Sequence, residues 1–145
     1  MRRSILPSAR GAAREDERTA IEASHLRSLA PEVVSELTNG ASRLSVPAGS
    51  IFHREGDTSI HIELVLSGLV RVYVTAPDGR TMTVRYCRPG ALIGTVSLFA
   101  SSFSLPATIQ AVTDANLLVL RASVMKRAAE NDLQVARALL DELSE

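Results

Sequence analysis

Apolar and polar residues alternate with a period of two through most of the chain between Ala41 and Leu120. This period is typical of strands that bury one face, and turns rich in Gly, Pro and Asp separate the alternating runs. We expect strands at about residues 43–46, 51–52, 60–66, 69–74, 82–86, 91–93, 108–112 and 117–120. Short strands at this spacing predict a mainly β fold, an eight-stranded antiparallel jelly roll (double-stranded β-helix).

Helical spacing replaces this alternation on both sides of the predicted roll. Before it, leucine and valine recur every three or four residues up to a stop at Asn39-Gly40, the positions being Leu26, Leu29, Val33 and Leu37. After it, a helical segment begins near Ala122 and is expected to flank the roll. We therefore divide the chain into a flexible arm (1–20), the roll with its N-terminal helices (21–121) and a C-terminal helix (122–145).

The C-terminal helix carries four apolar residues that step by three, four and three positions: Leu133, Ala136, Leu140 and Leu143. This is the a/d spacing of a coiled-coil seam, and it predicts dimerisation. It covers fewer than two heptads, so packing of the same residues on the roll fits the pattern equally well. The pattern still runs at Glu145, and we expect the natural chain to continue.

Composition narrows the function classes. The 145 residues carry 16 basic and 16 acidic side chains, only 3% are aromatic and there is no Trp, which argues against a nucleic-acid surface in this segment. The single cysteine, Cys87, excludes an internal disulfide and is interpreted as a small core residue. We predict no membrane span and no signal peptide, and hence a cytoplasmic protein.

The stretch 89–108 contains no charged residue, although it is placed like a ligand-binding insertion in the roll. After Gly94 a short helical turn is expected, and the free amides of such a turn favour an anion. We take the candidate pocket to be formed by Gly94, Thr95, Val96, Ser97, Leu98, Leu105, Pro106, Ala107 and Thr108. Apolar side chains dominate this set.

The order of these features resembles the cyclic-nucleotide-binding domain of Crp/Fnr transcription regulators. The resemblance covers residues 26–145 and rests on Pro47-Ala48-Gly49, Phe52, Gly56-Asp57, the block 66–73, Asp78-Gly79-Arg80, Pro89-Gly90 and Gly94. It implies a sensor that binds a small effector inside the roll and forms a homodimer through its C-terminal helix. DNA contact would come only through a C-terminal helix-turn-helix domain that these 145 residues do not contain.

The binding cassette departs from the family pattern. In nucleotide-binding relatives, a Glu that binds the ribose occupies the position of Thr95, and an Arg that pairs with the cyclic phosphate occupies that of Leu105. Pro106 replaces a small hydroxyl residue, whereas Ala107 matches. Leu cannot supply the charge-assisted contact of Arg, and burying a phosphodiester without a counter-charge is costly. Tight binding of cAMP or cGMP is therefore not expected, and no cofactor is predicted.

Only arginines on neighbouring strands could place a positive charge in the predicted pocket. Arg71, Arg85 and Arg88 could reach inward, but charged strand residues more often lie on the outer face.

A metal site of the cupin type would draw on His53, His61 and Glu63. We expect His61 and Glu63 on a solvated outer face instead, and we do not predict an enzyme.

Two interpretations stay open. Either the pocket holds an uncharged or weakly polar effector, or Leu105 and its neighbours fill it and leave a ligand-free dimerisation module. A true nucleotide sensor and a metal enzyme are weaker alternatives.

Overall fold

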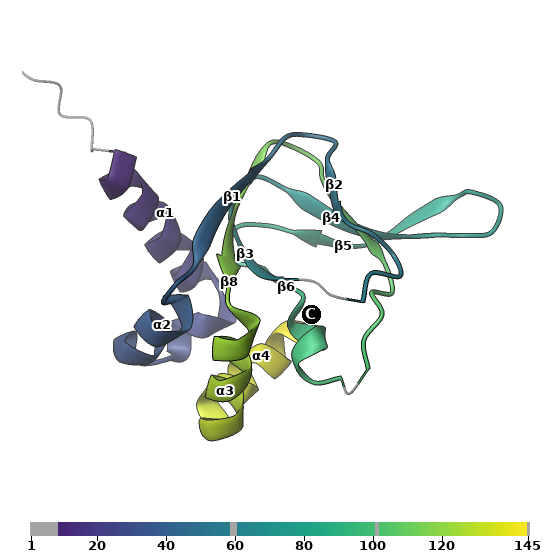
Figure 1. Ribbon diagram of the computed structural model, residues 1–145. Helices are drawn as coiled ribbons and strands as arrows, with labels where there is room; N and C mark the ends of the chain where they lie inside the picture. The colour runs from purple at the N-terminus through teal and green to yellow at the C-terminus, as the bar shows by residue number, and fades with distance from the viewer. Residues whose placement is uncertain (1–8, 59–60, 101, 145) are drawn as a thin grey trace, which may run out of the picture.

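Two four-stranded antiparallel sheets pack face to face in the computed structural model, which describes residues 9–58, 61–100 and 102–144 (Figure 1). The first sheet has the order β1 (Ser42–Val46), β8 (Ala115–Leu120), β3 (Ile62–Ser67) and β6 (Leu92–Ile93). The second has the order β2 (Ile51–His53), β7 (Thr108–Ala111), β4 (Val70–Thr75) and β5 (Thr81–Cys87). The predicted jelly roll with flanking helices is confirmed; Ile60, at the start of one predicted strand, lies outside the described residues.

Helices gather on the outer face of the first sheet (Figure 1). They are α1 (Ala9–Ala23), the 3-10 turn η1 (His25–Ser28), α2 (Pro31–Thr38), α3 (Ala122–Asn131) and α4 (Leu133–Leu143), while a second 3-10 turn, η2 (Thr95–Leu98), follows β6. Within the described residues no helix has both the length and the apolar character needed to cross a membrane.

The apolar side chains form two cores that share the first sheet as a wall. One core packs the helices on that sheet, with Leu26 and Leu139 against Ile62 and Leu64 of β3. The other fills the space between the sheets and contains Val65, the next residue of β3. Strand β3 is therefore buried on both faces, which an alternating sequence does not reveal.

The predicted flexible arm is wrong for its second part, because α1 begins at Ala9; residues 1–8 lie outside the described residues. The segment is rich in Ala, Arg and Glu, which have high helix propensity. Its C-terminal end is anchored by the buried Ala20, and Arg43 of β1 pairs with Asp16 and Glu17 on its surface.

The single C-terminal helix that we predicted is divided at Asp132. This residue has an extended backbone (φ −136°, ψ 110°), and its carboxylate accepts a hydrogen bond from the Gln134 amide as the N-cap of α4. An aspartate that caps a new helix favours a break over continuation.

The predicted seam lies mostly on the outer face of α4. The side chains of Leu133, Leu140 and Leu143 are 71%, 49% and 42% exposed, whereas α4 packs on the molecule through Val135, Ala138, Leu139 and Glu142. The exposed face leaves an apolar surface for a partner, and whether a second copy covers it stays a prediction.

Candidate functional site

A cavity of about 270 Å³ opens between the sheets beside the predicted cassette. Its wall combines the cassette with β4, β5, β7 and the end of α4, and consists of Val72, Val84, Arg85, Cys87, Leu92, Ile93, Gly94, Thr95, Val96, Leu105, Pro106, Ala107, Ile109 and Leu143. Most of these side chains are apolar. We call this space the roll pocket.

The rim of the roll pocket at η2 is shaped by Gly94. Gly94 has a left-handed backbone (φ 90°), which lets the chain leave β6 and enter the 3-10 turn directly. The Ser97 amide and hydroxyl both donate to the Gly94 carbonyl, at 3.1 and 2.7 Å, and fix the turn. Thr95 is buried in the pocket wall.

Leu105 is held by its backbone rather than by its side chain. Its amide donates to the Asp57 carbonyl and its carbonyl accepts from the Gly56 amide, both at 2.8 Å. These two bonds tie the cassette to the turn between β2 and β3 and leave the buried isobutyl group facing the roll pocket. A family Arg at this position would point into the same space.

The structure brings together six of the nine predicted pocket residues. Gly94, Thr95, Val96, Leu105, Pro106 and Ala107 line the roll pocket. The other three lie beside it: the Ser97 hydroxyl donates to the Gly94 carbonyl within η2, Leu98 packs on the helix-side core, and the Thr108 hydroxyl accepts a hydrogen bond from the Glu55 amide at 3.2 Å.

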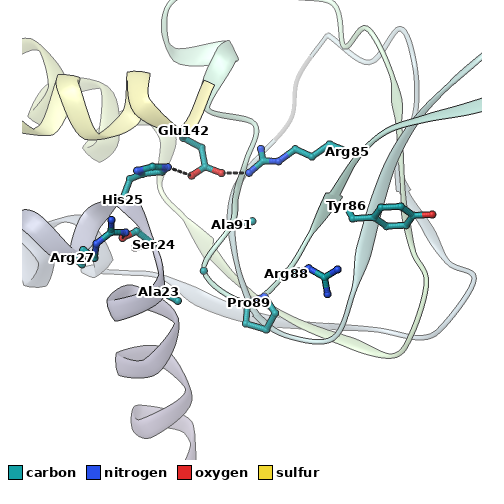
Figure 2. A pocket seen from close by; sticks show the side chains of 11 residues that line it. Ala23, Ser24, His25, Arg27, Arg85, Tyr86, Arg88, Pro89, Ala91 and Glu142 are labelled. Carbon is teal, nitrogen blue, oxygen red and sulfur yellow. Dashed lines mark hydrogen bonds and ion pairs between the residues drawn. The ribbon is translucent and has the colours of Figure 1, made fainter. Parts of the chain in front are cut away.

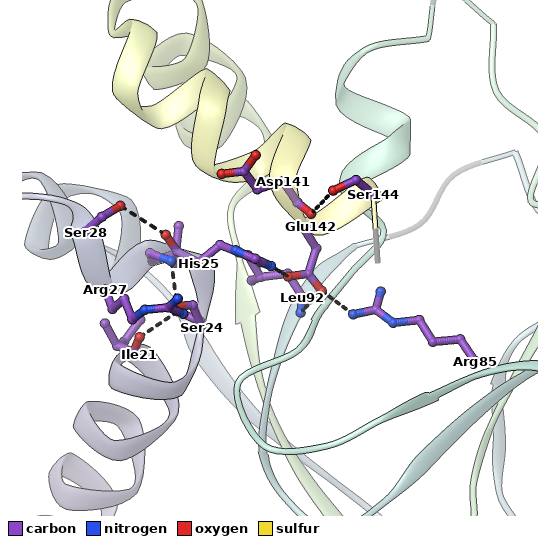
Figure 3. A network of polar contacts seen from close by, with 11 residues as sticks. Ile21, Ser24, His25, Arg27, Ser28, Arg85, Leu92, Asp141, Glu142 and Ser144 are labelled. Atoms are coloured by element: carbon purple, nitrogen blue, oxygen red, sulfur yellow. Dashed lines mark hydrogen bonds and ion pairs between the residues drawn. The ribbon is translucent and has the colours of Figure 1, made fainter.

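Arg85 points inward, against our expectation for a charged strand residue. It lines the roll pocket, and its guanidinium donates to Glu142 Oε1 across from α4 (Figure 3). The Glu142 side chain is only 1% exposed and also accepts from the Leu92 amide at 2.9 Å. The charge of Arg85 is thus already paired with a buried carboxylate.

The other two arginines do not enter the roll pocket. The Arg71 guanidinium lies 4.2 Å from the centroid of the Tyr73 ring, a cation–π contact. Arg88 is exposed at the end of β5.

Sequence reasoning missed several pocket residues because they come from elements far from the cassette. The sequence pattern predicts only a place in a strand for Val72, Cys87 and Ile109. For Leu143 it predicts only a place in the dimer seam. Alternation along β4 and β7 could have identified the inward positions. For Leu143 the signal was absent, since its place depends on the helix break at Asp132.

The solvated face predicted for Glu63 is wrong. Glu63 is 1% exposed inside the roll, where both carboxylate oxygens contact His53 Nε2, at 2.7 and 3.0 Å. The cause is the double burial of β3. His61, just before β3, is exposed as expected, and within the described part of the chain no group of three or more His, Cys, Asp or Glu side chains could hold a metal ion.

Residues 43–132, which run from β1 to the end of α3, match the cyclic nucleotide-binding domain family. The chain belongs to this family. The resemblance to Crp/Fnr regulators that the sequence suggested is confirmed by solved structures of such proteins.

One similar structure is the N-terminal domain of a transcriptional regulator from Streptomyces coelicolor A3(2), with 30% identity, 83% of each chain covered and a TM-score of 0.67. Another is the Thermus thermophilus Catabolite Activator Protein, with 30% identity over 83% of this chain and 56% of that one, and a TM-score of 0.71. The lysophospholipase nte1 of Aspergillus oryzae is 29% identical over 108 residues. That match covers 74% of this chain, which spans only 7% of the enzyme's length.

Proposed function

We propose that this protein is the effector-sensing domain of a Crp/Fnr-like transcription regulator, and that its roll pocket binds a compact, uncharged or weakly polar molecule instead of a cyclic nucleotide. In this proposal the domain is regulatory and performs no catalysis. It forms a homodimer through Leu133, Ala136, Leu140 and Leu143, and acts on DNA through a domain outside these residues.

The lining of the roll pocket is the observation that carries this proposal. Aliphatic side chains from both sheets and α4 surround the space, and Arg85, whose guanidinium is the one among the described lining residues, is paired with Glu142. A phosphodiester there would have to take Arg85 from a buried carboxylate, which then loses its counter-charge. An apolar ligand needs no such exchange.

The size of the pocket favours a small effector over an empty module. A volume of about 270 Å³, the liquid volume of about nine water molecules, leaves room for a compact molecule beside Leu105 and its neighbours. Pockets for drug-sized ligands begin at about 300 Å³, which points to a compact effector.

Leu143 supplies the route by which an effector would act. It lines the roll pocket and belongs to the exposed face of α4, so a ligand in contact with it changes the position of the surface proposed for dimerisation. A ligand that favours one position of α4 shifts the population toward it.

Thermal melting with cAMP, cGMP and a panel of small apolar molecules tests the proposal. The comparison variant is Thr95→Glu/Leu105→Arg/Pro106→Ser, which restores the family cassette. We expect a ligand at about 100 times its dissociation constant to add about 2.7 kcal/mol, a shift of several degrees, with an apolar molecule in the unaltered protein and with cyclic nucleotide only in the variant. A comparable shift of the unaltered protein by cAMP or cGMP would overturn the proposal.

A further inference from the structure

A second cavity, of about 360 Å³, lies outside the roll where η1, the end of β5, the turn before β6 and the end of α4 meet (Figure 2). We call it the basal pocket. It contains no residue of the cassette, and the family resemblance assigns it no role. Arg85 is the residue that it shares with the roll pocket.

Positive charge is concentrated in the wall of the basal pocket. Three arginines, Arg27, Arg85 and Arg88, line it together with His25, and among the described residues of its lining Glu142 is the one acidic side chain. The three guanidinium groups and the Glu142 carboxylate leave an excess of two positive charges, with His25 not counted. In a protein whose net charge is zero, this is a local imbalance built by η1, β5, the turn after β5 and α4.

The Glu142 carboxylate shows that the basal pocket already accommodates an oxyanion. It receives hydrogen bonds from the Arg85 guanidinium and the Leu92 amide, and His25 Nε2 lies 3.8 Å from its other oxygen (Figure 3). Donors from β5 and β6 and the imidazole of His25 from η1 thus converge on one carboxylate.

Two further guanidinium groups are not used by this carboxylate. Arg27 donates through one nitrogen to the Ser24 carbonyl at 3.0 Å, which leaves other N–H groups of its five donors. The Arg88 side chain has no hydrogen bond or ion pair with any residue that the structure describes. The planar, permanently charged fork of Arg suits phosphate and carboxylate groups.

We propose that the basal pocket is a binding site for a small dianionic oxyanion of the phosphate type, held by Arg27, Arg85 and Arg88. The charge of such a ligand matches the excess of the pocket. Its oxygens accept from the remaining N–H groups of Arg27 and from Arg88, and they compete with Glu142 for Arg85. The basal pocket is proposed on its own lining residues, without reference to the effector proposed for the roll pocket, and either site can exist without the other.

Anion binding here is coupled to α4. The anion and Glu142 compete for Arg85, so occupancy weakens the polar contact that holds the end of α4 on β5. Because Leu143, the next residue, lines the roll pocket, ligands at the two sites change each other's affinity by the same factor.

Titration with inorganic phosphate, followed by the backbone amide signals of His25, Gly90 and Ala91 in NMR, tests the site. Sodium chloride keeps the ionic strength constant, since unspecific charge effects are screened by any salt. We expect saturable shifts, and an affinity reduced about five- to tenfold by Arg88→Gln or by Arg27→Gln, the effect of losing one charge-assisted contact. The matched control is Arg80→Gln, at a side chain that is 89% exposed in the β4–β5 turn, and it should leave the affinity unchanged.

A fourth variant separates binding from folding. Glu142→Gln keeps the shape and an acceptor for the Leu92 amide but removes the competing charge, and phosphate should bind about threefold more tightly to it. The proposal is overturned if phosphate shifts the signals no more than chloride does, or if the affinity is the same in Arg27→Gln, Arg88→Gln and the unaltered protein. Arg27 and Arg88 lie near the surface, so the loss of one guanidinium is not expected to unfold the domain.

Discussion

The buried pair of His53 and Glu63 offers the sharpest test of how the interior of the roll is stabilised. Both carboxylate oxygens of Glu63 contact one ring nitrogen of His53, and both side chains are buried. The two strands that carry them, β2 and β3, belong to different sheets, so the pair connects the two sheets across the roll. We predict that His53→Ala is strongly destabilising.

The magnitude follows from the group that is left behind. Removing His53 leaves the Glu63 carboxylate buried without its partner, which typically costs about 3–5 kcal/mol. For a domain of this size, that loss corresponds to a decrease in melting temperature of about 6–20 °C. Replacing both groups by apolar residues, in His53→Leu/Glu63→Leu, removes the charge altogether and is expected to be neutral or stabilising.

Urea unfolding followed by circular dichroism at pH 7 measures these differences. The control is His61→Ala, which removes an exposed histidine close to the same strand and should change the free energy of unfolding by less than about 0.5 kcal/mol. The reasoning is refuted if His53→Ala costs less than about 1 kcal/mol, or if the double Leu variant is less stable than His53→Ala.

Two further predictions concern a turn and a surface. Gly68→Ala should lower the free energy of unfolding, measured in urea, by clearly more than Gly79→Ala does. Both glycines have a left-handed backbone, so both changes cause backbone strain. A Cβ at Gly68 would in addition lie 2.3 Å from the Asp114 carbonyl oxygen, whereas a Cβ at Gly79 meets nothing within 4 Å. If the two variants lost the same free energy of unfolding, the backbone around Gly68 would have moved to make room for the methyl group, and the reasoning would be wrong. Leu140→Glu should weaken self-association at least about tenfold in sedimentation equilibrium, since it places a charge in the proposed dimer face. Val112→Glu, at another exposed apolar residue, should not, and equal effects of the two changes would remove α4 as the interface.

The sequence was sufficient to predict the roll because its signals are local. Alternation along β4 and β5, with a turn at Asp78-Gly79, depends only on neighbouring residues. The cassette was predictable for the same reason, since Gly94 and Leu105 lie within one short segment. Helix propensity is also local, but the first 20 residues show no clear apolar periodicity, so their sequence predicts an arm where α1 begins at Ala9.

The polar contacts could not be predicted, because they join residues far apart in the chain. Arg85 and Glu142 are separated by 57 positions, and their pairing depends on where α4 begins after Asp132. His53 and Glu63 are only 10 positions apart, yet they lie on different sheets. Alternation placed Glu63 on the same face as His61 and gave no sign that β3 is covered on both sides.

The break at Asp132 also explains why Arg85 lies between the roll pocket and the basal pocket and pairs with α4. If α3 and α4 were one straight helix, the chain after Asp132 would continue along the axis of α3, whereas the break turns α4 so that it packs on η1 and η2. This packing brings Glu142 to Arg85 and Leu143 to the roll pocket. Arg85 thus lies between the roll pocket and the basal pocket, and its guanidinium is paired with Glu142 of α4. Under the two proposals made above, a charged ligand on either side competes for that guanidinium, while an apolar ligand acts on α4 only through Leu143. The same short helix would then respond to two chemically different ligands by two separate contacts.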